Sequence, residues 1–366
     1  MTLIKLPPRN KTLKGHKLVI TDPRALPEDA LPRLRARFPD LQVQPFDADA
    51  TDPWEGATLA LGSGRNLPSI DKAGKLELFQ LTSAGADGLV GKPIFDDTEI
   101  AFCTASGVHG RMGGEHLSRL PASLARVPRK STPRPVGTLQ TLLPRSHPPP
   151  SLSPSSRALN PTNPINLPRG ILGYGSVGRQ VARVCKAVGM TVHAYTLHPR
   201  RTPSSRRDPS YAPPGLGDPD GLLPDRWFAG ASAAELHAFL SSGLDLLVVA
   251  LPLTPQTRGR LAAREFAALR GAFVSNVGRG PIVNTADLVE ALEGGVIRGA
   301  ALDVTDPEPL PADHPLWRAR NVTITPHVSG ESSKYMERVF EVLLENLTRL
   351  SNGERLMNLI NRREGY

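Results

Sequence analysis

The chain has few of the residues that mark extracellular or membrane proteins. Among its 366 residues there are only two cysteines, Cys103 and Cys185, which lie far apart in apolar stretches. Such a pair predicts packed thiols in a reducing compartment, because a disulfide framework or a metal site needs more cysteines at closer spacing. No run of 18 apolar residues is present, so the sequence predicts no membrane-spanning helix.

Recognisable targeting signals are also missing. The segment 1–17 is basic, but Pro7 and Pro8 interrupt any amphipathic helix, and no apolar core of the signal-peptide kind follows. Residues 364–366 form neither a peroxisomal nor a retention signal. We therefore expect a cytoplasmic protein that binds no membrane.

Acidic residues are almost missing from one segment, 111–168. It carries eight basic residues, one acid and 12 of the 37 prolines, so it supplies +7 of the net charge of +9. The rest of the chain is close to neutral. Nucleic-acid binding through this segment is disfavoured, because it has no interleaved aromatic residues and matches no known module. Its composition is typical of a disordered or extended linker.

The first hundred residues alternate between short apolar stretches and turns, which predicts a small parallel α/β unit. The predicted strands are 17–21, 41–46, 57–62, 75–83 and 99–105. Leu31, Leu34 and Phe38 recur at helical spacing after the first strand. The loops 82–87 and 106–110 follow strands, where sheets of this kind bind ligands, although a plain turn explains their glycines equally well.

Residues 169–196 predict a strand, a glycine turn, an amphipathic helix and a second strand. The turn has the GxGxxG spacing of dinucleotide-binding proteins, and it comprises Gly173, Tyr174, Gly175, Ser176, Val177 and Gly178. The first glycine permits the tight turn, the second lets backbone approach a pyrophosphate, and the third lets the helix pack closely on the strand. Free N–H groups at the helix start favour the phosphates.

The strand and helix pattern continues to the end of the chain. Further strands are predicted at 245–251, 272–276, 299–304 and 322–325, with helices closing at 236–240 and covering 262–269 and 285–293. With the two strands around the glycine turn this makes six, which matches a doubly wound nucleotide-binding sheet. A final helix carries Met336, Phe340, Leu343, Leu347 and Leu350 on one face and is expected to dock on another element.

Three loops after strands of this second unit carry the candidate catalytic side chains. Arg279 lies between glycines and suits bidentate capture of a carboxylate. Glu308 and His327 form a plausible acid–base pair, because a carboxylate orients an imidazole and favours its protonated form. Taken singly, they could equally be a surface ion-pair partner, a solvated acid and a core histidine. Together with a nucleotide fold they point to hydride transfer to a 2-oxo acid.

These segments resemble the D-isomer-specific 2-hydroxyacid dehydrogenase family, in particular its glyoxylate/hydroxypyruvate reductase-like members. The matching segments are 170–179, 251–254, 275–281, 300–310 and 324–330, together with Ser83-Ala84-Gly85. The resemblance implies two α/β domains, a flavodoxin-like small catalytic domain and a Rossmann doubly wound nucleotide-binding domain. It also implies a homodimer, with the final helix returning to the small domain.

The resemblance also implies roles for individual residues. His327 is the expected proton donor and Glu308 its partner, while Arg279 binds the carboxylate and carbonyl of the substrate. Backbone N–H groups of Ala84 and Gly85 hold the other end of the carboxylate. No metal is expected. The expected cofactor-binding residues are Gly173, Gly175, Ser176, Val177, Gly178, Thr196, Arg200, Arg201, Pro252, Thr257, Val277 and Asp303, the last beside the nicotinamide.

Cofactor choice depends on the residue at the end of the second strand of this unit, the strand that follows the helix after the glycine turn. NAD enzymes of this fold place an acid there, which accepts a hydrogen bond from the ribose 2′-OH. This chain has Thr196, followed by Arg200 and Arg201. A hydroxyl and two arginines suit a 2′-phosphate, so the sequence predicts NADPH over NADH. The alternative is a merely basic exposed loop.

Residues 117–168 depart from the family pattern. Pro121 falls where the family has a helix interior, at a cost of about 3 kcal/mol. We interpret 117–168 as a disordered or aberrant segment, out-of-frame or untranslated in origin. The predicted domains are then 1–116, completed by 331–366, and the nucleotide-binding domain 169–330. Two alternatives to a 2-oxoacid reductase stay open: a catalytically silent nucleotide-sensing protein of the same fold, and an inactive product of a faulty gene model.

Overall fold

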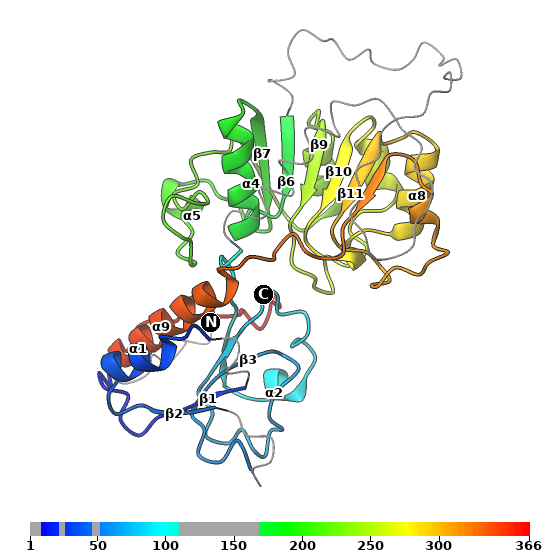
Figure 1. Cartoon of the computed structure of the whole chain (residues 1–366). Coiled ribbons are helices and arrows are strands. Elements are labelled where there is room, and N and C mark those ends of the chain that lie inside the picture. The colour runs from blue at the N-terminus through cyan, green and yellow to red at the C-terminus, as the bar shows by residue number, and fades with distance from the viewer. Residues whose placement is uncertain (1–8, 22–25, 46–51, 110–167) are drawn as a thin grey trace.

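The computed structural model describes residues 9–21, 26–45, 52–109 and 168–366. Two α/β lobes are visible, each built on its own sheet (Figure 1). All but the last residue of the segment 117–168 lies outside the described residues, so the structure does not test its interpretation.

The first sheet has five parallel strands in the order β2-β1-β3-β4-β5. The strands are β1 (Lys17–Ile20), β2 (Gln42–Pro45), β3 (Leu59–Gly62), β4 (Leu78–Leu81) and β5 (Ala101–Cys103). This order is that of flavodoxin-like sheets, so the prediction for the small domain is confirmed. Each strand lies within one of the predicted stretches. Four of them are largely buried apolar runs, whereas in the edge strand β2 Gln42 is exposed and Val43 is only partly buried.

Helices cover both faces of this sheet. Alternate strand residues point to opposite faces: Leu18 packs with α1 (Ala30–Arg37) and the long helix α9 (Tyr335–Asn352), and Phe79 packs with α2 (Pro93–Asp96). Most of the apolar stripe of α9 is buried there, with Phe340 and Leu343 both at 0% exposure and Met336 partly buried. The last part of the chain therefore completes the first lobe, as Figure 1 shows.

The second sheet has seven parallel strands in the order β12-β11-β10-β9-β6-β7-β8. They are β6 (Pro168–Leu172), β7 (Thr191–Thr196), β8 (Arg226–Ala229), β9 (Leu246–Val249), β10 (Phe273–Asn276), β11 (Gly299–Leu302) and β12 (Val322–Ile324). The chain starts in the middle at β6, runs outward to β8 and then returns past β6 to β9. This reversal of direction defines a doubly wound sheet with a switch point beside β6.

The prediction of six strands in this sheet is wrong, because it missed β8. Arg226 is exposed and the other three residues of β8 are only partly buried. Its apolar run, residues 227–229, is short and follows a connection without periodicity, so the pattern did not mark it as a separate strand. The doubly wound fold class itself is confirmed.

Helices also cover both faces of the second sheet. The helix after the glycine turn, α4 (Ser176–Ala187), packs on one face through Val181 and Cys185. The opposite face is covered through Leu236, Phe266 and Leu288. These side chains belong to α6 (Ala233–Leu240), α7 (Ala263–Ala268) and α8 (Thr285–Glu293), and shorter helical segments are α5 (Pro203–Arg206), η3 (Gly280–Ile282) and η4 (Pro315–Trp317).

Both cysteines are buried free thiols, as predicted. Burial raises the pKa of Cys185 to about 11, and it also raises the pKa of Cys103. Neither thiol is therefore ionised near neutral pH. None of the described helices combines the length and the apolar character that a membrane crossing requires.

Candidate active site

The glycine turn after β6 leaves no room for side chains at two of its three glycines. Gly173 has φ +102°, and a Cβ atom there would lie 2.6 Å from the carbonyl oxygen of Ala250. At Gly178 a Cβ atom would lie 2.2 Å from the carbonyl oxygen of Gly173. At Gly175, in contrast, a Cβ atom would meet nothing within 4 Å. The turn thus packs tightly against β9 and leaves open space above Gly175.

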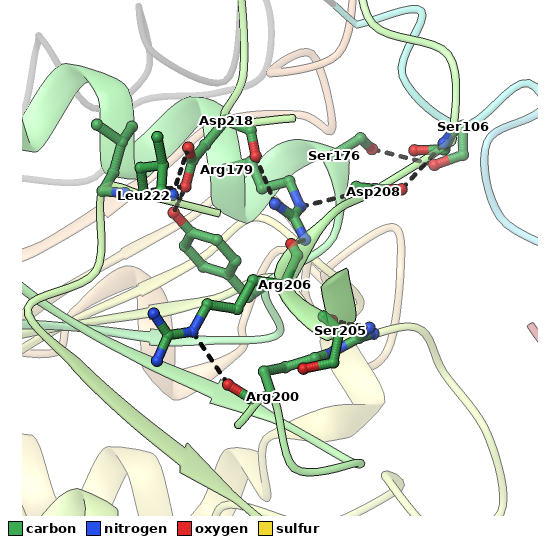
Figure 2. Close-up of polar contacts among 12 residues, drawn as sticks. Ser106, Ser176, Arg179, Arg200, Ser205, Arg206, Asp208, Asp218 and Leu222 are labelled. Atoms are coloured by element: carbon green, nitrogen blue, oxygen red, sulfur yellow. Dashed lines mark hydrogen bonds and ion pairs between the residues drawn. The ribbon is translucent and has the colours of Figure 1, made fainter. Parts of the chain in front are cut away.

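This open space lies at the start of α4. Gly175 is the N-cap residue, and no side chain caps the first turn of the helix. The only hydroxyl of that turn, Ser176 Oγ, lies 3.0 Å from Ser106 Oγ of the first lobe (Figure 2). Uncapped N–H groups beside open space fit the pyrophosphate of a dinucleotide. The residues of the turn therefore fit the cofactor that the sequence predicts.

A buried arginine next to the turn fixes the long connection between β7 and β8. Arg179 donates to the carbonyl oxygens of Asp218 and Arg206, and its Nε lies 3.0 Å from Asp208 Oδ2 (Figure 2). Tyr174 donates to Asp218 Oδ2 at 2.7 Å. These contacts hold the connection across α4. The sequence pattern gave no sign of them, because the connection has no periodicity of its own.

The predicted ribose-binding residues lie where β7 ends. Thr196 is 9% exposed, and its hydroxyl donates to the carbonyl oxygen of His198 at 2.8 Å. Arg200 Nη1 donates to the carbonyl oxygen of Ser205 at 2.6 Å, and Arg206 Nε donates to the carbonyl oxygen of Arg200 at 3.1 Å (Figure 2). Arg201 is exposed. Three arginines therefore lie in the segment 200–206, and two of them are tied to its backbone.

Two further loops of the second lobe carry predicted cofactor residues. Thr257 donates to the carbonyl oxygen of Pro252 at 2.7 Å and accepts from Thr254 N at 2.8 Å, which closes the loop after β9. Val277 N donates to the carbonyl oxygen of Val249 at 3.1 Å and so ties the loop after β10 to β9. Both loops lie at the carboxyl edge of the sheet, next to the switch point.

Arg279 bridges the two lobes. Its Nε and Nη2 lie 3.1 and 3.0 Å from Asp87 Oδ1, in the loop after β4. A Cβ atom on Gly85 would lie 2.1 Å from Arg279 Nη2, so the guanidinium lies closely against this glycine. The predicted anchor therefore lies against the backbone of the Ala84–Gly85 loop. Asp87, which the sequence prediction missed, already accepts from this arginine.

Glu308 and His327 lie in contact. His327 Nδ1 is 2.7 Å from Glu308 Oε1, and the two side chains are 47% and 41% exposed. His327 has φ +55°, an uncommon conformation for a residue with a side chain. Its N–H donates to the carbonyl oxygens of Asp303 at 2.8 Å and of Thr325 at 3.0 Å. The backbone is thus held in a conformation that directs the ring towards Glu308.

Asp303 organises the loop that carries His327. Its side chain is buried, and it accepts from Thr325 Oγ1 at 2.6 Å, Val328 N at 3.0 Å and Ser329 N at 2.9 Å. Burial alone raises the pKa of Asp303, but these hydrogen bonds outweigh it and hold the pKa below its usual value. The carboxylate is therefore ionised at neutral pH and fully used by the loop 325–329.

A histidine that the sequence did not single out as a site residue joins the two lobes. His109 Nδ1 lies 3.0 Å from the carbonyl oxygen of Gly330, and its ring lies 5.3 Å from that of Tyr335. Burial lowers the pKa of His109, and nearby Arg279 and His327 lower it further. The imidazole is therefore neutral, and it contacts the segment between β12 and α9, where the chain returns to the first lobe.

The three candidate catalytic residues lie after three adjacent strands. Arg279 follows β10, Glu308 follows β11 and His327 follows β12, so all three are at one edge of the sheet. The loop after β4 faces them from the first lobe through Asp87. Within the described parts of the chain, no group of histidine, cysteine and acidic residues is suited to hold a metal ion. The arrangement offers a cation, a carboxylate–imidazole pair and a dinucleotide turn.

Comparison with known proteins finds similar dehydrogenases and reductases. Residues 225–329 match the family model of the D-isomer specific 2-hydroxyacid dehydrogenase NAD-binding domain. Over 175 residues the chain is 38% identical to a glyoxylate/hydroxypyruvate reductase A of Serratia proteamaculans, covering 48% of this chain and 49% of the relative. Over 194 residues it is 33% identical to a glyoxylate reductase of Aeropyrum pernix, covering 53% and 51%.

A solved structure matches over nearly the whole length. The D-isomer specific 2-hydroxyacid dehydrogenase from Xanthobacter autotrophicus Py2, in complex with NADPH and MES, has a TM-score of 0.68 and 27% sequence identity. The match covers 96% of this chain and 100% of that chain. In the sequence comparison, however, the chain spans about half the length of the curated relatives that it matches.

Proposed function

We propose that the chain is a member of the D-isomer-specific 2-hydroxyacid dehydrogenase family, which it resembles in sequence and structure, and that it reduces a small 2-oxo acid to the D-2-hydroxy acid with NAD(P)H. Glyoxylate and hydroxypyruvate are the proposed substrates, after the names of the relatives. The observation that carries the proposal is the placement of Arg279, Glu308 and His327 at the edge of a sheet that also carries a dinucleotide turn.

Arg279 is the proposed anchor of the substrate carboxylate. A guanidinium binds a carboxylate through two parallel N–H groups. Its Nε and Nη2 now lie within 3.1 Å of Asp87 Oδ1, which holds the guanidinium beside the Ala84–Gly85 loop, so a bound substrate carboxylate would take the place of Asp87 on these nitrogens. Backbone N–H groups of that loop complete the proposed carboxylate site. The 2-oxo group is thereby directed towards His327.

His327 is the proposed proton donor. Its Nδ1 is engaged by Glu308, so the other ring nitrogen, Nε2, carries the proton for the carbonyl oxygen. Glu308 fixes the ring and stabilises the imidazolium. Because both side chains are nearly half-exposed, the pair can regain its proton from solvent after each turnover. Bound nicotinamide dinucleotide supplies the hydride that goes to the carbonyl carbon.

The fit for the dinucleotide rests on several groups of residues. Gly173, Gly175, Ser176, Val177 and Gly178 are proposed to hold the pyrophosphate, and Thr196, Arg200 and Arg201 the ribose. Pro252, Thr257, Val277 and Asp303 are proposed to line the rest of the site. For Asp303 the contacts add a second role, because its carboxylate holds the loop of His327.

We further propose that NADPH is preferred over NADH. A double variant, Arg200→Ala with Arg201→Ala, is expected to raise the dissociation constant for NADPH about thirtyfold, because two charged hydrogen-bond donors to the 2′-phosphate are lost. Binding of NADH should change little. The control is Arg207→Ala, since Arg207 is 72% exposed and paired with Asp220. Fluorescence titration with both nucleotides measures the effect, and an unchanged NADPH preference in the double variant would disprove the assignment.

Single-turnover oxidation of NADPH tests the reaction itself. Excess enzyme mixed with NADPH should lose nucleotide absorbance in one exponential phase, forming glycolate from glyoxylate or D-glycerate from hydroxypyruvate. A chain that binds NADPH tightly but oxidises none with any small 2-oxo acid would instead be a nucleotide-sensing protein. A chain that binds no nucleotide would be the inactive product of a faulty gene model.

The remaining proposals concern the whole molecule. We propose a catalytic domain of residues 1–116 completed by 331–366, a nucleotide-binding domain of residues 169–330, and a homodimer. A cytoplasmic location is proposed from the two buried free thiols. The interpretation of 117–168 as aberrant is tested by transcript sequencing across this junction, since a spliced transcript that encodes the same residues would refute it.

A further inference from the structure

The segment 358–366 is built into the first lobe along the edge strand β5. Asn358 Nδ2 donates to the carbonyl oxygens of Thr104 and Ser106 at 3.1 and 2.9 Å. Ile360 N donates to the carbonyl oxygen of Phe102 at 2.9 Å. The guanidinium carbon of Arg362 lies 4.6 Å from the centre of the Phe95 ring. These contacts fix the position from which the last residues reach outwards.

The last residues of this segment contact the other lobe. Glu364 Oε1 lies 2.9 Å from His198 Nε2, in the loop after β7. A Cβ atom on Gly365 would lie 3.6 Å from Thr254, in the loop after β9, and 3.5 Å from Val90 of the first lobe. One short segment thus touches the loops that follow both neighbours of β6.

Those two loops flank the glycine turn, because β6 lies between β9 and β7 in the sheet. In folds of this type the ribose of the adenosine half lies at the carboxyl end of the second strand, which here is β7. The residue at that end, Thr196, carries no charge. Glu364 brings a carboxylate from the other lobe to the loop that follows this strand, where it pairs with His198, two residues after Thr196.

Resting on the proposed function, we infer that Glu364 is a second determinant of cofactor choice. A carboxylate beside the ribose accepts from a 2′-hydroxyl and repels a 2′-phosphate. Glu364 therefore acts against Arg200 and Arg201, and it limits the preference for NADPH. Its side chain is 28% exposed, so solvent screens the repulsion only in part.

The test compares the dissociation constants of NADPH and NADH, measured by fluorescence titration at about 50 mM ionic strength. Glu364→Gln keeps a hydrogen-bonding group and removes the charge, and it should tighten NADPH binding about fivefold with NADH binding unchanged or weaker. Glu364→Lys should shift the ratio of the two constants further in the same direction. Both shifts should shrink in high salt, which a structural effect of the substitution would not do.

Glu345→Gln is the matched control. Glu345 is 42% exposed and pairs with Arg349 within α9, at 2.7 Å. The substitution Glu345→Gln removes the same charge from the first lobe, and it should leave the dissociation constants of NADPH and NADH unchanged. A loss of folded protein lowers the binding of both nucleotides equally, so it cancels in the ratio of the two dissociation constants. A less stable variant therefore still gives a decisive result.

Two results would count against the inference in different ways. An unchanged NADPH to NADH ratio in both Glu364 variants overturns the role of Glu364 and leaves the proposed reaction standing. A parent protein that binds neither nucleotide overturns the proposed function together with the inference.

Discussion

Replacing His327 by glutamine should lower kcat/KM for the 2-oxo acid about a thousandfold, because the proposed proton donor is removed. Glutamine retains a hydrogen-bonding group that can contact Glu308, 2.7 Å from the imidazole. Since His327 lies after β12, away from the glycine turn, the dissociation constant for NADPH should stay the same. Stopped-flow absorbance of NADPH and a separate nucleotide titration measure the two effects.

Two controls separate a chemical role from a structural one. His16→Gln changes a histidine whose Nδ1 lies 3.1 Å from Thr58 Oγ1 in the first lobe, and it should leave kcat/KM unchanged. Glu308→Gln should lower kcat/KM less than His327→Gln. The double variant should be no worse than His327→Gln alone, because Glu308 acts through the imidazole. Full additivity of the two losses, or a normal rate in His327→Gln, would contradict the assignment.

Most of the fold could be predicted because its strands are short buried apolar runs. β9 and β10 illustrate this, since all of their residues are buried. β8 was missed for a different reason. Its apolar residues, 227–229, follow a connection that has no periodicity of its own, so the pattern does not mark where the strand begins. Burial alone does not separate the two edges of this sheet, because β12 is no better covered and was predicted.

The candidate site was predictable to the extent that it lies on loops after strands. Arg279 and His327 could be found from their positions in the sequence, but their supporting partners could not. Asp87 lies 192 residues from Arg279, and no local pattern connects the two. Asp303 shows a related limit: its position beside the site was expected from the family resemblance, but its use in holding the loop of His327 appears only in the hydrogen bonds.

The segment after α9 shows the same limit on a larger scale. In the sequence, residues 358–366 show no pattern that predicts a contact with the other lobe. Their contact with His198 requires that α9 first dock on the first sheet and that the chain then return along β5. Contacts of this kind depend on the arrangement of two lobes, which spacing along the chain does not encode.

The largest expected loss of stability comes from Asp245→Asn. Asp245 lies just before β9 and is 14% exposed. Its oxygens lie 2.5 Å from Arg169 of β6, which is 5% exposed, and 2.5 Å from Arg298, which lies just before β11. Removing the charge leaves the buried Arg169 without its counter-ion, which should cost about 3 kcal/mol of unfolding free energy.

The pH dependence of this loss has a defined sign. Burial raises the pKa of Asp245, but the two arginines outweigh it and hold the pKa below its usual value. The pair therefore stabilises the fold fully above the unfolded carboxyl pKa of about 3.9, and this contribution disappears as the pH falls through the lower, folded value. The free energies of urea unfolding of the parent and of Asp245→Asn should differ most near neutral pH and converge in acid.

The control is Asp220→Asn, at an ion pair in which both side chains are more than half exposed. It should cost at most about 0.5 kcal/mol of unfolding free energy at any pH. Equal losses of unfolding free energy in Asp245→Asn and Asp220→Asn would contradict the prediction that the buried pairing of Arg169 with Asp245 matters for stability.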